Sequence, residues 1–193
     1  MLWKVDTTNS DVHFTVKQMG MISISGKFDY VKGTLEYDPD APENTEVSIK
    51  VRADSLEVPV DLHRRYLLSN SFFKAKQYSE ITVNSTDVDV QDENRVNITA
   101  DLTIRDLTRP VLMHIVKERE TVDEFTKNPA ILFKGQIRLK RGDFKLRFPA
   151  MIDWMVGEEI VLNITAHVIQ MQNYEEDLPS ILRRPKNFPP KSD

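Results

Sequence analysis

Hydrophobic and polar residues alternate along most of this chain. In the run from 96 to 104, Val96, Ile98, Ala100, Leu102 and Ile104 share one face, and polar residues occupy most of the positions between them. Alternation with a period of two indicates a strand with one buried face and one wet face. Similar runs occur at 12–16, 47–51, 131–139 and 160–168, with shorter candidates at 22–30, 33–37, 80–90 and 111–119. The pattern predicts about eight or nine strands.

The connections between these runs are short and contain turn-forming residues. Pro39 and Pro42 punctuate an acidic loop, and only a few residues join the runs on either side of 91–95 and 105–110. A parallel crossover needs a dozen or more residues, so short connections predict antiparallel neighbours. Such an all-β chain closes its edges as an up-and-down barrel or folds as a sandwich.

One segment, 60–73, breaks the strand period. Leu67 and Leu68 follow Arg64 and Arg65, which predicts a short helix with an apolar stripe, and the segment then ends in a pair of phenylalanines. A helix this short is not stable alone and must pack on the sheet. Two interpretations stay open at this point. The segment is either a structural plug of a solid core, or a lid over one barrel end whose inward side chains are Leu67, Phe72 and Phe73.

Composition narrows the function classes. The 193 residues fit one domain, and 40% hydrophobic with 29% charged residues is an ordinary globular composition. The absence of cysteine excludes disulfides, thiol catalysis and thiolate metal sites. A formal net charge of −4 argues against a general nucleic-acid binder. We therefore expect no nucleic-acid partner.

The beginning of the chain shows no basic region followed by a long apolar run, and no window approaches 18 uninterrupted apolar residues. We therefore expect no signal peptide and no transmembrane segment in the given chain. The expected location is cytoplasmic if residue 1 is the natural start, and periplasmic or secreted if a leader has been removed.

Catalytic signatures are lacking. His13, His63, His114 and His167 are scattered, with no partner at i+2 or i+4. A zinc site needs three or four convergent ligands, and neither a Gly-x-Ser-x-Gly elbow nor a phosphate-binding glycine loop is present. The expectation is a non-enzymatic protein without a cofactor or a metal site.

Six ordered segments resemble the YceI-like family of polyisoprenoid-binding, lipocalin-like proteins. They are the opening "WKVDTTNSDVHFTVKQMG", then "ISGKFDYVKGTLEYD", "LLSNSFFKAKQYSEITVNST", "LTIRDLTRPV", "RGDFK" and "VGEEIVLNI". The resemblance runs in register from about residue 3 to about residue 171. The departures are mostly polar: Asn9, Gln18 and Tyr66 stand where the family often has histidines, and Ser79, Asp106 and Lys145 replace a proline and two glycines.

The resemblance implies an antiparallel up-and-down, lipocalin-like β-barrel of about eight strands with one short helix, which holds a long apolar chain and performs no chemistry. The implied ligand is an isoprenoid, an isoprenoid quinone or a fatty-acid-like amphiphile. Each buried methylene is worth about 0.8 kcal/mol, so an apolar chain can bind tightly without polar contacts. The candidate ligand-binding residues are Phe14, Val16, Met19, Met21, Phe28, Leu67, Phe72, Phe73, Ile81, Met113, Phe133 and Phe144.

A diphosphate or carboxylate headgroup would need cations at the barrel mouth. The basic run "IRLKRGDFKLRF" and the arginine pair of the helical segment supply them, although solvated strand ends explain the same charges. The candidate headgroup rim consists of Arg64, Arg65, Lys140 and Arg141.

The chain divides at about residue 171. Residues 1–171 form the expected barrel, and residues 172–193 form a proline-rich tail outside the resemblance. The family resemblance also implies a possible homodimer. An alternative function stays open: a ligand-free β module that recognises a partner through a sheet edge or through this tail.

Overall fold

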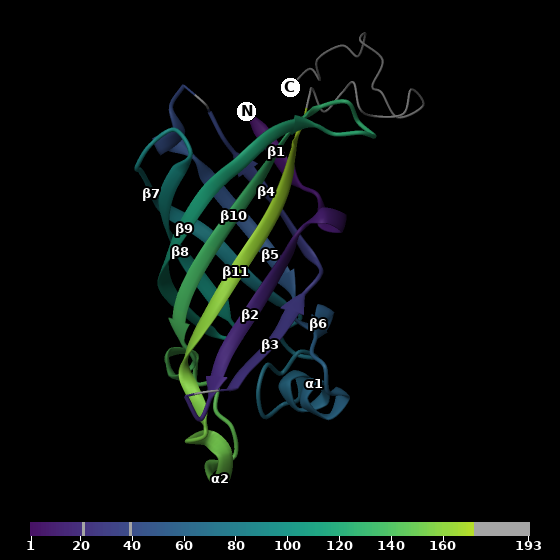
Figure 1. Ribbon diagram of the computed structural model, residues 1–193, viewed down its shortest axis with the longest axis vertical. Coiled ribbons are helices and arrows are strands. Elements are labelled where there is room, and N and C mark those ends of the chain that lie inside the picture. Colours follow the sequence, from purple (N-terminus) through teal and green to yellow (C-terminus); the bar gives the residue numbers. More distant parts are fainter. Residues whose placement is uncertain (21, 39, 172–193) are drawn as a thin grey trace, which may run out of the picture.

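The structure is a computed structural model that describes residues 1–193 except 21, 39 and 172–193, so the predicted tail lies outside the described residues. The described part contains eleven strand segments, two short helices and four 3₁₀ turns (Figure 1). The strands are β1 (Leu2–Val5), β2 (Asp11–Gln18), β3 (Ile22–Phe28), β4 (Val31–Glu36), β5 (Glu46–Arg52), β6 (Leu56–Glu57), β7 (Glu80–Val90), β8 (Arg95–Ile104), β9 (Leu107–Val122), β10 (Pro129–Lys140) and β11 (Val156–Gln170).

These eleven segments form one closed antiparallel barrel of eight strands. The last strand, β11, pairs with β10 on one side and with both β1 and β2 on the other. The 3₁₀ turn Thr7–Asn9 separates β1 from β2, so the two segments act as one long interrupted strand beside β11. In the same way, β3 pairs with β2 and β4 pairs with β1. Closure leaves few unpaired edges, as expected for a barrel.

Inward-facing positions follow the alternation of the sequence. Ile98, Ala100, Leu102 and Ile104 of β8 are all buried. The pairing register brings Ile98 opposite Met113 of β9, and both side chains belong to one apolar core. Strict alternation therefore fixed which face of each strand turns inward.

Gly26 of β3 lies where the Phe14 ring closely approaches the backbone. Gly26 lies directly opposite Phe14 in the β2–β3 register. A Cβ atom at this position would lie 2.6 Å from Phe14 ring atoms and from the carbonyl oxygen of Glu57. The absence of a side chain lets the Phe14 ring lie over the strand, where it contacts the cavity.

The two barrel ends differ. The lower end of Figure 1 holds the turn after β2, the segment between β5 and β7 with helix α1 (Asp61–Leu68), the turn after β8 and the segment between β10 and β11 with helix α2 (Ala150–Asp153). The upper end holds the connections after β4, β7 and β9.

The predicted barrel and the predicted helix at 60–68 are confirmed. The prediction of a single helix was wrong, since α2 follows Pro149, and the short segments β1 and β6 were not expected as strands. β9 extends over 107–122 rather than 111–119, because its alternation weakens where both of its ends lie at the barrel rims. None of these differences alters the face that each strand turns inward.

Candidate functional site

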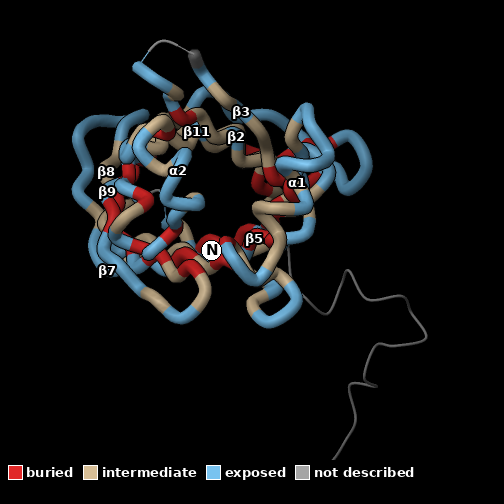
Figure 2. Tube along the Cα trace, turned by 90° about the horizontal axis from the view of Figure 1, so that it is seen from below, coloured by how far each residue is buried: buried red, intermediate tan, exposed pale blue. Residues whose placement is uncertain are grey.

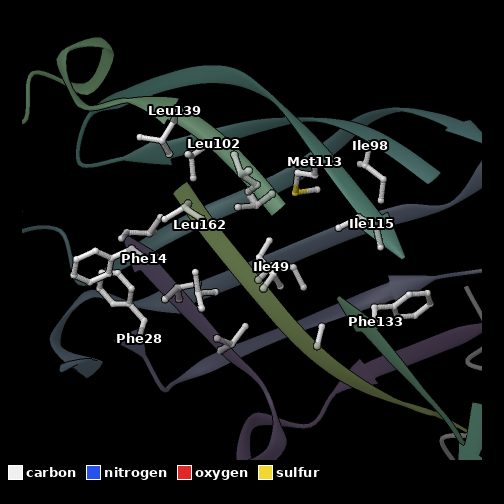
Figure 3. A pocket seen from close by; sticks show the side chains of 18 of the residues that line it. Phe14, Phe28, Ile49, Ile98, Leu102, Met113, Ile115, Phe133, Leu139 and Leu162 are labelled. Carbon is white, nitrogen blue, oxygen red and sulfur yellow. The ribbon is translucent and has the colours of Figure 1, made fainter. Parts of the chain in front are cut away.

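A large cavity runs through the barrel interior. Its volume is about 1250 Å³, and residues of both barrel ends contribute to its wall. Figure 3 shows apolar side chains that converge on it from opposite strands, among them Phe14 and Phe28 at one end of the view and Phe133 at the other. Drug-sized ligands occupy pockets of about 300–1,000 Å³, so this cavity suits a larger guest.

The polar side chains of the wall gather at the two ends. At the lower end they are Gln18, His63, Tyr66 and Arg141. Between the ends, the described lining consists of apolar residues such as Ile49, Ile98, Leu102, Met113 and Leu162. At the upper end the polar lining residues are Tyr37, Thr45, Asp92, Glu93, Asn94, Lys117, Glu120 and Thr121.

A continuous series of aromatic rings lines the lower part of the cavity. Phe14 lies 6.1 Å from Phe28 between ring centroids, Phe28 lies 6.0 Å from Phe73, and Phe73 lies 5.0 Å from Phe72. Phe72 continues the series to Phe148 at 5.1 Å. Such tilted and edge-to-face pairs are favourable beyond the area that they bury. The series joins β2 and β3 to the segments around α1 and α2.

Specific hydrogen bonds hold the Phe72-Phe73 pair in this position. The backbone N–H of Phe73 donates to the carbonyl oxygen of Leu67 at 2.9 Å. The Arg105 guanidinium, from the turn between β8 and β9, donates to the carbonyl oxygen of Phe72 at 2.9 Å. The segment after α1 is thus tied to the far side of the barrel, and its two rings form part of the cavity wall.

Tyr66 of α1 connects the helix to the segment before α2. Its ring stacks on Phe148 with centroids 5.7 Å apart, and its hydroxyl donates to the carbonyl oxygen of Arg147 at 3.2 Å. Burial raises the pKa of Tyr66, and the nearby Asp153 carboxylate raises it further. The phenol therefore stays neutral and keeps its hydrogen bond.

Arg141 is a buried clamp at the same end. Its side chain is 2% exposed, and its guanidinium donates to the carbonyl oxygens of Gly157, Leu146, Asp153 and Val156. It also donates to the Asp153 carboxylate at 2.6 Å. This hydrogen bond, together with one from the Phe148 backbone N–H, lowers the pKa of Asp153. The clamp fixes the whole connection that carries α2.

Most of the predicted ligand-binding residues line the cavity. The structure brings together Phe14, Val16, Phe28, Leu67, Phe72, Phe73, Ile81, Met113 and Phe133. Leu67, Phe72 and Phe73 thus face inward at one barrel end, which is the arrangement expected of the lid. Whether any of these residues contacts a ligand stays a prediction.

Two predicted ligand residues lie elsewhere. Met19 is 56% exposed at the tip of the β2–β3 turn, where it and Gly20 adopt the left-handed backbone that a tight hairpin requires. The turn ends the alternation, so Met19 projects away from the cavity. Phe144 is buried in the 3₁₀ turn Arg141–Phe144 and lines a separate small pocket beside Val111. Met21 is outside the described residues.

The predicted headgroup rim is not assembled as one site. Arg64 donates to the carbonyl oxygens of Leu56 and Asp54, and Arg65 pairs with Asp61 on the surface of α1. Lys140 is exposed outside the cavity, and the Arg141 guanidinium is used by the clamp. The four residues share the lower end, but Arg141 alone among them lines the cavity.

Sequence reasoning missed several wall residues of the lower end, chiefly Tyr66, Phe148 and Ile152. The sequence indicates Tyr66 only as a replacement of a family histidine. Phe148 and Ile152 belong to "RFPAMIDW", whose aromatic and proline residues after a basic turn were the available signal. No group of three or more histidines, aspartates or glutamates in the described part of the chain could hold a metal ion.

The sequence profile described as the YceI-like domain matches residues 3–168. The chain belongs to the YceI-like family. Among curated relatives, a UPF0312 protein of Vibrio campbellii is 28% identical over 144 residues, which cover 74% of this chain and 76% of the relative. Protein YceI of Escherichia coli O6:H1 is 26% identical over 137 residues, or 70% of each chain.

Solved structures share the fold of this YceI-like protein. Burkholderia cenocepacia BcnA superposes with a TM-score of 0.74 at 21% identity, over 86% of this chain and 99% of that one. A polyisoprenoid binding domain from Saccharophagus degradans, implicated in plant cell wall breakdown, gives a TM-score of 0.66 at 14% identity, over 88% and 98%. In the described part of this chain, no helix is long and apolar enough to cross a membrane.

Proposed function

We propose that this YceI-like protein binds and carries a long-chain amphiphile, isoprenoid in kind, inside its barrel without converting it chemically. The observation that carries the proposal is the cavity of about 1250 Å³, whose described wall is apolar between its two ends. Apolar burial is non-directional and proportional to area, so such a wall favours a long flexible chain over a compact polar molecule.

The dimensions of the barrel support a chain-like guest. The longest strand, β9, has 16 residues. At a rise of about 3.3 Å per residue and a tilt of about 40°, a strand of this length spans roughly 40 Å of barrel axis. The lining runs from Asn94 at the upper end to Ile152 at the lower end, so an extended tail can lie along most of that length. The Saccharophagus neighbour is itself called a polyisoprenoid binding domain.

The wall also supports a carrier rather than an enzyme. General acid–base catalysis needs a titratable side chain within hydrogen-bond reach of the reacting atom. The titratable groups that line the described wall lie at the two ends, away from an apolar middle. Of the four histidines, only His63 lines the cavity, at the lower mouth.

An anionic headgroup fits the lower mouth better than the upper one. Arg65 and Arg147 have side chains that are more than half exposed at the lower end, where they pair with Asp61 and Asp153 at the surface. At the upper end, the half-buried Lys117 is already paired with Glu120 at 2.7 Å, and Asp92 and Glu93 lie in the same wall. Asp92 and Glu93 would repel an anionic headgroup but not a neutral alcohol or quinone, so a neutral headgroup can lie at either end.

The interaction-module alternative gains little from the described residues. Its sheet-edge version needs an unpaired strand, whereas β11 closes the sheet against β1 and β2. Its tail version concerns residues outside the described part.

The test combines extraction with a blocked cavity. Organic extraction of the purified protein followed by mass spectrometry should release a lipid, and the delipidated protein should take up geranylgeraniol. Leu162→Trp places a large ring in the middle of the cavity and should abolish uptake, whereas Asn163→Trp places the same ring on the outer face of β11 and should not. Absence of lipid in the extract together with no uptake by the parent protein would refute the proposal.

A further inference from the structure

Large apolar side chains are exposed at both ends of the barrel, and those of the lower end surround the cavity mouth. In the described part, six large hydrophobic residues of this end are exposed by 44–87% of their surface. Figure 2, which looks at the barrel from below, places α1 and α2 on two sides of the opening. The six residues come from three separate connections and are Met19, Val60, Leu62, Met151, Ile152 and Trp154.

This apolar rim is continuous with the cavity. Leu62 of α1 and Ile152 of α2 are exposed to solvent and also line the cavity wall. Single exposed hydrophobic residues are ordinary on protein surfaces, but a group that surrounds an opening marks a contact surface. A chain that leaves the cavity at this end therefore meets apolar side chains before it meets water.

Charge separates the two ends. The lower connections (residues 19–21, 53–79, 105–106 and 141–155) carry eight basic and six acidic residues. The upper connections (37–45, 91–94 and 123–128) carry one basic and seven acidic residues. In the field of an anionic surface, this distribution turns the lower end toward the surface and the upper end away from it.

Trp154 is suited to an interface between water and lipid. Trp154 is 75% exposed, yet its indole N–H already donates to the carbonyl oxygen of Met151 at 3.0 Å. Insertion of the ring among the lipid headgroups would therefore leave no donor without a partner. Trp154 directly follows the short helix that carries Met151, which is 87% exposed.

We propose that the lower end docks on the surface of an anionic lipid bilayer, with Met19, Met151 and Trp154 inserted among the headgroups and the cavity mouth facing the membrane. The docking surface rests on the exposed rim and the charge distribution. Its purpose, the passage of an amphiphile between bilayer and cavity without crossing water, rests on the proposed function.

Sedimentation with vesicles tests the docking. The parent protein should bind vesicles of equal parts phosphatidylglycerol and phosphatidylcholine, and binding should weaken at high salt and on pure phosphatidylcholine. Met151→Asp with Trp154→Ala should weaken binding at least tenfold. The matched control is Phe125→Asp, which changes an equally exposed apolar residue, 90% exposed, at the upper end and should bind like the parent.

Fluorescence gives a second readout. The chain has two tryptophans, of which Trp3 is buried in the cavity wall and Trp154 is exposed. Docking should shift the emission of Trp154 to shorter wavelength on mixed vesicles, and the shift should survive in a Trp3→Phe variant.

The outcomes separate docking from carriage. No binding to mixed vesicles, or equal loss in the Phe125→Asp control, would overturn the docking proposal even if geranylgeraniol is taken up. A lower-end dimer that the double variant abolishes, without vesicle binding, would overturn it in favour of a protein contact. Vesicle binding without any lipid uptake would uphold docking and refute the proposed function.

Discussion

The upper and lower ends of the barrel close the same eight strands with very different connections. At the upper end the connections are short and acidic, and at the lower end two long segments, 53–79 and 141–155, place aromatic rings, a buried arginine and exposed apolar tips around the mouth. The strands alone close the barrel, because the β1–β11 pairing completes the ladder. The long lower segments are therefore available to shape access to the cavity.

Removal of the arginine clamp should have the largest effect. Arg141→Met removes one donor from the Asp153 carboxylate and one from each of four carbonyl oxygens, and loss of one partner of a buried pair typically costs about 3–5 kcal/mol. Denaturant titration of the variant and the parent measures this loss as a difference in the free energy of unfolding. The matched control is Arg138→Met, whose pair with Glu159 is exposed on both sides and should be worth at most about 1 kcal/mol. Equal effects of the two variants would contradict the clamp.

Substitution of Phe72 and Phe73 should distinguish a role in stability from a role in ligand binding. Phe72 is 3% exposed, so Phe72→Ala should lose about 3 kcal/mol or more of stability. Phe73 is only half-buried, and Phe73→Ala should cost about 1–2 kcal/mol and be partly restored by excess geranylgeraniol, because a ligand fills the space beside the ring. Melting temperatures with and without the alcohol measure both. If both variants bind like the parent while melting much lower, the pair is a structural plug.

Low pH should destabilise the fold at both ends of the barrel, through a different carboxylate at each end. The Arg141 hydrogen bond lowers the pKa of Asp153, and at the upper end the backbone N–H and hydroxyl of Thr126 lower the pKa of Asp123. A carboxyl group whose pKa is lower in the folded protein stabilises the fold at any pH above its usual pKa of 3.8. This stabilisation is lost as the pH falls through the lowered pKa of the folded state.

The effect can be assigned to one end by substitution. Asp153→Asn should lower the melting temperature at pH 7 and flatten the decline of that temperature as the pH falls below about 4. Asp123→Asn at the upper end should also lower the melting temperature at pH 7 and flatten its decline in acid. The Tyr66–Phe148 contact at the lower mouth should stay intact in this variant. A decline with unchanged slope in Asp153→Asn would show that the clamp does not contribute to acid sensitivity.

Charge reversal at the mouths should have the smallest effect. Arg65→Glu with Arg147→Glu should weaken geranylgeranyl diphosphate binding about three- to fivefold and leave geranylgeraniol binding unchanged, since exposed ion pairs contribute little. Lys117→Glu at the upper end should change neither. Isothermal titration with both ligands measures this, and an equal loss for both would exclude a headgroup at the lower mouth.

Sequence reasoning succeeded where one local rule governs the structure. Alternation placed Phe14, Phe28 and Phe133 on the cavity side, because a strand cannot turn one residue inward without its neighbours at i±2. It failed where connections take over. Met19 lies off the predicted face because the hairpin turn requires a left-handed backbone. Arg141 forms a clamp because the connection that carries α2 packs against its guanidinium. Such tertiary contacts leave no period in the sequence.

The pairing of β1 with β11 also sets the order of assembly. Trp3 lies opposite Gln170, so the last ladder joins residues from the two extremes of the barrel sequence. Contacts of such long range are slow to form, and during synthesis this one must wait until β11 has left the ribosome. Until then the nascent sheet stays open, with its apolar inner face and a free edge in contact with water. The half-made barrel is therefore the species most exposed to aggregation and most dependent on chaperones.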